Sequence, residues 1–120
     1  MRLLTPLKYK AWADRRTLNA VAQIVEVECP AAFAFARQQL NHMVRVEELF
    51  RARLVAASDP HTTTNTDWLP RLEELDRRLM ASNQWLQDYA NELGPDQANE
   101  RVRFQFVDGA SGMLSREEVI

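Results

Sequence analysis

The sequence has 120 residues, of which 46% are hydrophobic and 27% are charged, a composition typical of one globular domain and not of a disordered chain. The formal net charge of −2 and the isoelectric point near 5.7 lack the basic excess of nucleic-acid-binding domains, so we expect no nucleic-acid partner. We therefore predict that residues 1–120 form a single domain.

Two further features bear on the compartment. Cys29 is the only cysteine, so the chain forms no internal disulfide and nothing indicates an oxidising environment. No apolar stretch is long enough for a signal peptide or a membrane span. We expect a cytoplasmic protein without a membrane partner, and we interpret Cys29 as a free thiol because no base lies near it in the sequence.

The first predicted element is a helix that starts at Thr5-Pro6, with threonine as cap and proline in the first turn. Its apolar residues recur at three- and four-residue steps: Leu7, Ala11, Leu18, Val21, Ala22 and Val25. Asp14 lies on the same face. A buried carboxylate needs a partner, so we expect an ion pair or a cap to a neighbouring helix in preference to a catalytic role.

A second helix is predicted from about Ala31 to Ala57, after the break at Cys29-Pro30. Two adjacent rows of side chains predict a wide buried face: Ala36, Leu40, Met43, Phe50 and Leu54 in one, and Phe35, His42, Val46 and Leu49 in the other. Residues 58–66 have the polar composition of a loop.

A third helix is predicted to be capped by Thr66 or Asp67, with Pro70 in its first turn, and to end at Gly94-Pro95. Its apolar stripe is the clearest in the chain: Trp68, Leu72, Leu75, Leu79, Leu86, Tyr89 and Leu93. The three tryptophans, Trp12, Trp68 and Trp85, stand at helical positions compatible with core packing, which explains them better than base stacking.

The last part of the chain predicts an extended segment and the start of a fourth helix. Val102, Phe104 and Phe106 alternate with polar residues before a turn at Asp108-Gly109, although pairing into a hairpin stays open. Residues 115–118, Ser-Arg-Glu-Glu, form a capping box followed only by Val119 and Ile120. We therefore predict an all-α four-helix bundle with a crossover connection, its last helix largely missing from this chain.

His42 is the strongest candidate for chemistry. It lies on the predicted buried face of the second helix, with its imidazole expected to point toward the bundle axis. A hydrogen-bonded core histidine is the commoner alternative, because a catalytic metal site needs about three protein ligands and His61, the only other histidine, lies in a polar loop. Glu47 could accept a hydrogen bond from a ligating imidazole, but an ion pair with an arginine of another helix is favoured.

The motifs resemble those of the DinB-like (DinB/YfiT) family of bacterial metalloprotein bundles. The resemblance covers essentially the whole chain and rests on residues 9–18 (YKAWADRRTL), on residues 40–44 (LNHMV) with Glu47 and Phe50, on the segment opened by Trp68, and on residues 104–115. It implies a divalent metal, zinc, nickel or similar, bound by His42 and by two histidines four residues apart on the fourth helix. Those two histidines have no counterpart in this sequence, so the implied site would be completed by residues beyond the chain.

The sequence is compatible with two functions. The resemblance implies a metal-dependent enzyme, for example a thiol-dependent transferase or a hydrolase-like protein, whose partners would be a small-molecule thiol or substrate and a second copy in a homodimer. The alternative is a non-enzymatic helical module that uses an uncovered apolar groove for interaction or dimerisation.

Overall fold

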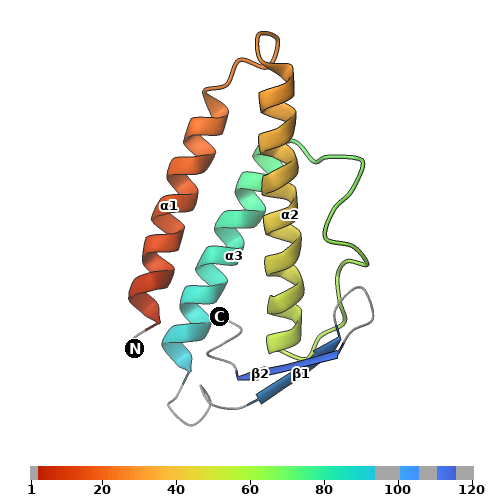
Figure 1. Ribbon diagram of the computed structural model, residues 1–120. Coiled ribbons are helices and arrows are strands. Elements are labelled where there is room, and N and C mark those ends of the chain that lie inside the picture. Colours follow the sequence, from red (N-terminus) through yellow and green to blue (C-terminus); the bar gives the residue numbers. More distant parts are fainter. Residues whose placement is uncertain (1–2, 94–100, 106–110, 116–120) are drawn as a thin grey trace.

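The computed structural model describes residues 3–93, 101–105 and 111–115. In these ranges three helices, α1 (Leu4–Ala22), α2 (Pro30–Leu54) and α3 (Leu72–Glu92), precede a hairpin of two strands, β1 (Arg101–Gln105) and β2 (Ser111–Ser115) (Figure 1). The helices form the body of the molecule, and α3 packs against both α1 and α2. The predicted all-α class is therefore confirmed, with a small hairpin added.

The core lies where the three helices meet. Its buried cluster takes two side chains from each helix: Leu18 and Val21, Leu40 and Val44, Leu75 and Leu79. Five of these six residues belong to the predicted stripes. Val44 was not predicted, yet it is fully buried, because the buried face of α2 includes Leu40, Asn41 and Val44 and is rotated away from the predicted row that contains Phe35.

The first two helices begin and end close to the predicted residues. Leu3 is the N-cap of α1 and makes no side-chain hydrogen bond, so Thr5 lies inside the first turn and is not the cap. Pro30 opens α2, where its missing N–H costs nothing, as expected from the break before it. The end of α2 comes at Leu54, three residues before the predicted Ala57.

The predicted start of the third helix is wrong. α3 begins at Leu72, and Arg71 is its N-cap in an extended conformation. Pro70 disfavours helical geometry at Leu69, so the chain stays extended before the helix. Trp68 therefore lies in the preceding loop and is 73% exposed, where the sequence predicted a core residue.

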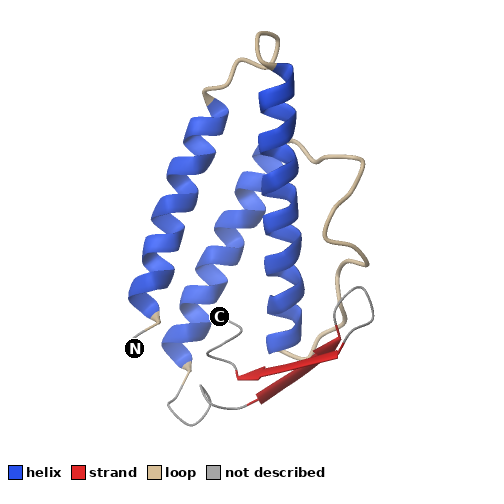
Figure 2. Ribbon diagram, in the orientation of Figure 1, coloured by secondary structure: helices blue, strands red, loops and turns tan. Residues whose placement is uncertain are grey.

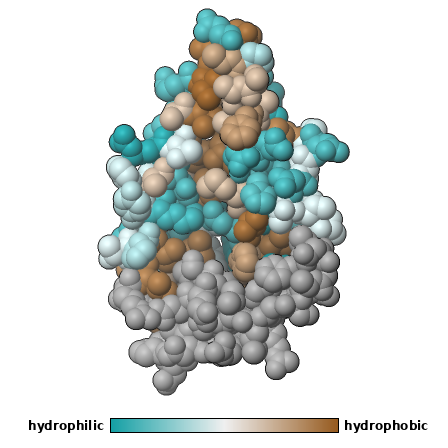
Figure 3. Space-filling model, viewed as in Figure 1, coloured by the Kyte–Doolittle hydropathy of each residue, from teal (hydrophilic) through white to brown (hydrophobic). Residues whose placement is uncertain are grey.

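Several other predicted core residues are exposed. Trp12 is 54% exposed on α1, and Val25 and Phe35 are exposed near the turn between α1 and α2. In Figure 1, α3 begins well short of this turn, which leaves that end of the helix pair uncovered. Val25 and Val27 are accordingly exposed. At the top of the space-filling view, apolar residues lie among polar ones on the surface (Figure 3).

The two strands pair in an antiparallel register that joins Arg101 to Ser115 and Phe104 to Gly112. The extended segment predicted from Val102 is confirmed over β1, and its pairing is now established. The hairpin lies at the end of the bundle where α2 ends (Figure 2), and β1 contacts α2. The predicted helix start at residues 116–120 lies outside the described residues, while Ser115 ends β2. Within the described part of the chain, no helix is both long and apolar enough to cross a membrane.

Candidate functional site

The loop of residues 55–71 runs back along α2 and is held there by side chains of that helix. The contacts join Arg37 to the Leu69 carbonyl, Asn41 to the Thr66 hydroxyl, His42 to the Thr64 carbonyl, Arg45 to the Thr63 carbonyl, and Glu48 to His61, all at 2.7 to 3.0 Å. As residue numbers rise along α2 they fall along the loop, so the two segments are antiparallel. We call these five contacts the loop clamp.

His42 belongs to this clamp. Its Nδ1 lies 3.0 Å from the Thr64 carbonyl oxygen, so the ring faces the loop and the expected orientation toward the bundle axis is wrong. A carbonyl only accepts hydrogen bonds, which places a proton on Nδ1 and leaves the Nε2 lone pair available in the neutral imidazole. Metal-ligating histidines commonly have this arrangement, with a carbonyl holding one ring nitrogen and the other free to bind.

His61 forms part of a charged cluster with Glu48 and Arg78. Its Nε2 lies 2.7 Å from Glu48 Oε1, and Arg78 donates to both oxygens of the same carboxylate. Burial raises the pKa of Glu48, but the hydrogen bonds from Arg78 and His61 outweigh it and hold that pKa below its usual value. The hydrogen bond to Glu48 in turn raises the pKa of Arg78 against the opposing effect of burial. The cluster therefore contains an ionised carboxylate between two donors.

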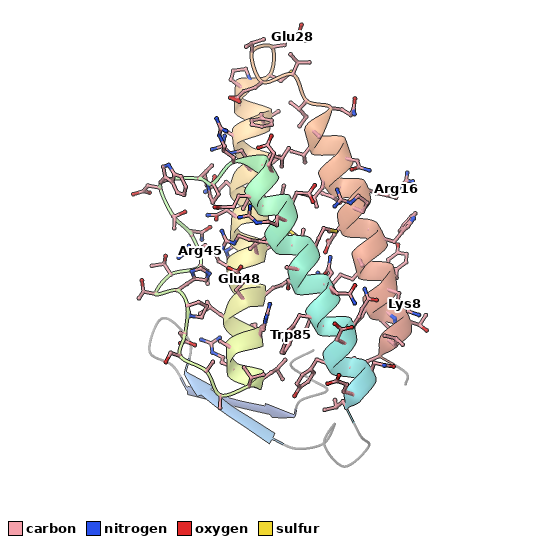
Figure 4. The ribbon with its side chains drawn as sticks, turned by 180° about the vertical axis from the view of Figure 1, so that it is seen from behind. Lys8, Arg16, Glu28, Arg45, Glu48 and Trp85 are labelled. Atoms are coloured by element: carbon pink, nitrogen blue, oxygen red, sulfur yellow. The ribbon has the colours of Figure 1, made fainter. Side chains whose placement is uncertain are left out.

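A cavity of about 710 Å³ opens beside this cluster, bounded by α2, the loop and the first half of α3. Its lining includes Asn41, Arg45, Glu48, His61 and Arg78. Figure 4 labels Arg45 and Glu48 on the side of α2 along which the loop passes. The volume of the cavity suits a small organic molecule, and the cavity lining combines apolar residues with several polar groups, as ligand sites do.

A second polar cluster, centred on Lys10 of α1, joins the three helices. The Lys10 ammonium lies 2.7 Å from Asp14 and 3.0 Å from Glu47, and Asn83 donates to Asp14 over 2.9 Å. Asp14 therefore has an ion pair, with Lys10 of its own helix, and its contact with a neighbouring helix is the hydrogen bond from Asn83. Glu47 is paired across helices as favoured, but its cationic partner is a lysine and not an arginine.

The described residues do not by themselves assemble a metal site. Across residues 3–93, 101–105 and 111–115, no three His, Cys, Asp or Glu side chains come together in a way that could hold a metal ion. His42 therefore fits as a single ligand, and neither His61 nor Cys29 completes a set with it. Cys29, at the N-cap of α2, is an exposed free thiol as predicted.

Several residues of these clusters were not singled out in the sequence. Asn41, Arg45 and Glu48 recur at helical spacing on one face of α2, beside His42, and this polar row was the available signal. Lys10 and Arg78 could not be assigned, because their partners are distant in sequence.

Comparisons with known proteins support a family assignment. A search of curated proteins and a search of solved structures each found no match. The family model described as DinB family matches residues 2–119. Because this match spans almost the whole sequence, the chain belongs to the DinB family.

Proposed function

We propose that this DinB-family protein binds a divalent metal ion, such as zinc or nickel, through His42 Nε2 and acts as a metal-dependent enzyme. The observation that supports this most directly is the contact between His42 Nδ1 and the Thr64 carbonyl. That contact fixes the ring and directs metal binding to Nε2, because only one nitrogen of a neutral imidazole has a free lone pair.

The remaining ligands of the proposed site come from outside the described residues, since no described group completes it. A bound divalent ion would lower the pKa of a coordinated water or thiol and so supply a nucleophile at neutral pH. That chemistry suits thiol-dependent transfer or hydrolysis, with a small-molecule thiol or substrate as the partner.

Metal analysis of the purified protein after dialysis against zinc or nickel tests the proposal. His42→Gln keeps an amide N–H for the Thr64 carbonyl but is a poor ligand, so we expect metal affinity to fall by about tenfold or more. His61→Gln is the matched control and should retain the wild-type metal content. Full metal content in the His42 variant, or none in the wild type, would contradict the proposed site.

A non-enzymatic role as a dimerisation module is the second candidate, and one specific observation favours it. Tyr9 and Trp12 are 66% and 54% exposed on α1, and their ring centroids are 5.6 Å apart. Arg16 lies over the Trp12 ring on the same face. Exposed aromatic and arginine side chains are enriched in protein interfaces, so we propose that this face of α1 meets a second copy of the chain.

A further inference from the structure

Asn41 provides the starting point, because its amide is buried and only half satisfied. The residue is 1% exposed and lines the cavity beside the loop clamp. Its Nδ2 donates to Thr66 Oγ1 over 2.8 Å, and the Thr66 hydroxyl donates its own hydrogen to the Trp68 carbonyl. Thr66 Oγ1 must therefore accept from Asn41. This requires the Nδ2 atom of the amide to face Thr66 and identifies the other atom as Oδ1.

Asn41 Oδ1 is then left as a buried acceptor with no partner in the described part of the chain. Leaving such a group unsatisfied costs about 1–3 kcal/mol, and native structures rarely retain one without a reason. Asn41 lines the cavity, so a molecule bound there is in a position to supply the donor that this buried oxygen lacks.

The charges on the cavity wall indicate the rest of the ligand. Arg45 contacts only the carbonyl and hydroxyl of Thr63, and Arg51 lies 4.9 Å from the centroid of the Trp85 ring, so neither guanidinium faces a carboxylate among the described residues. Arg78, in contrast, is matched by Glu48 and Glu74. The wall therefore carries surplus positive charge, which attracts an anion.

Apolar groups line the same cavity, including Ala52, Val55, Pro60 and the exposed Trp68. They suit the carbon skeleton of an organic ligand better than a bare inorganic ion. We propose that the cavity binds a small organic carboxylate whose anionic end meets Arg45 and Arg51 and whose other end donates a hydrogen bond to Asn41 Oδ1. The proposed site needs no metal and does not include His42, so it goes beyond the metal-dependent function proposed above.

Three related probes test the two recognition elements. Titration of 4-hydroxyphenylacetate into the EDTA-treated full chain at low salt, followed by amide NMR shifts, should show saturable binding that moves the signals of cavity residues. Phenylacetate lacks the donor and 4-hydroxyphenethyl alcohol lacks the anion, so each should bind about tenfold more weakly, a difference of about 1.4 kcal/mol. No saturable binding of the first probe, or equal affinity for all three, would overturn the proposal.

Variants locate the contacts. Arg45→Gln and Arg51→Gln should each weaken 4-hydroxyphenylacetate about five- to tenfold, while Arg77→Gln, an exposed position on α3 outside the cavity, should not. Asn41→Leu should abolish the preference for 4-hydroxyphenylacetate over phenylacetate, provided its circular dichroism matches the wild type. Unchanged affinity in both cavity arginine variants would refute the site even if the Asn41 variant failed to fold. Because all titrations contain EDTA, their outcome is independent of metal binding at His42.

Discussion

Lys10 is the residue through which the polar contacts of α1 reach both other helices. Its ammonium contacts Asp14 on its own helix, Glu47 on α2 and Asn83 on α3. Both carboxylates are largely buried, and Ser82 supplies Glu47 with a second donor. The cluster thus contains two negative charges that depend on one cation.

Replacing this cation should be costly. In Lys10→Met the two carboxylates remain in place without their cation, and removal of one member of a buried ionic cluster destabilises by about 3–5 kcal/mol. Because Lys10 is one-third exposed, we expect the lower end, about 3 kcal/mol, in the free energy of unfolding measured with urea.

Lys8→Met is the control for Lys10→Met. Lys8 points outward from α1 (Figure 4) and makes no hydrogen bond or ion pair within the described residues. Its substitution should change the free energy of unfolding by no more than about 0.5 kcal/mol. Equal effects of the two substitutions would show that the cluster contributes nothing specific.

The pair formed by Glu48 and Arg78 makes stability depend on pH. The pKa of Glu48 is lowered in the folded protein, so its stabilisation is fully present above the ordinary value of 4.5 and is lost as the pH falls through the lower folded-state value. Asp76 acts in the same direction, since the hydrogen bond from Arg15 lowers its pKa. Below about pH 4.5 the free energy of unfolding should therefore fall with decreasing pH.

Glu48→Gln removes one of these titrations. The variant starts less stable at neutral pH because Arg78 loses its main partner, but its loss of stability on acidification should be shallower than that of the wild type. Urea unfolding at a series of pH values measures both slopes, and Glu73→Gln controls for the change in net charge. If the free energy of unfolding of Glu48→Gln fell with decreasing pH as steeply as that of the wild type, Glu48 would not contribute to the pH dependence of stability.

At the level of elements, the C-terminus of α2 carries a local strain. Ala56 has φ of 56°, in the left-handed region that favours glycine, while the N–H of Ala57 donates to the Ala52 carbonyl over 2.8 Å. Ala56→Gly should remove the steric cost and raise the free energy of unfolding by about 0.5–1 kcal/mol. Ala57→Gly, one residue on and without a positive φ, should not stabilise. A stabilisation that is equal at the two positions would contradict this explanation.

The loop clamp should control how often the segment between α2 and α3 opens. Thr66→Val keeps the side-chain shape but removes the acceptor for Asn41 and the donor to the Trp68 carbonyl. Leaving the buried Asn41 amide unsatisfied costs about 1–3 kcal/mol, so protease cleavage within residues 55–71 should accelerate about five- to hundredfold under native conditions. Thr62→Val, at an exposed position in the same loop, should be cut at the wild-type rate. Equal cleavage of the two variants would exclude the clamp.

The helices were predictable because their apolar spacing is a local property of the sequence. Leu18, Leu40, Leu75 and Leu79 all lie in the core as their stripes predict. The start of α3 was not predictable from spacing alone. Trp68 continues the stripe, yet Pro70 and the use of the Thr66 hydroxyl at the Trp68 carbonyl keep this segment in the loop.

The candidate site was less predictable than the fold. His42 was found from its position on α2, but its orientation depends on a loop carbonyl twenty-two residues away. The lining of the cavity includes Glu48 paired with Arg78. These residues are thirty positions apart, so the periodicity of one helix does not predict their contact. Composition identified the loop as polar, whereas its ordering along α2 arises from side chains of the helix.

At the scale of the whole molecule, the proposed contact with a second copy would bury Tyr9 and Trp12 of α1. Tyr9 and Trp12 lie on the side of α1 opposite its buried residues Leu7 and Leu18, so an interface there would not disturb the core.

Trp12→Lys places a charge at the centre of the proposed contact, and burying an unpaired charge is unfavourable. Sedimentation velocity should show a dimer for the wild type and a monomer for this variant at the same concentration. Val27→Lys, at another exposed apolar position, should remain dimeric. In a symmetric dimer the same residue lies on both sides of the contact, so the Trp12→Lys variant would place two lysines there. A wild type that is monomeric throughout, or a Trp12 variant that still dimerises, would exclude this face.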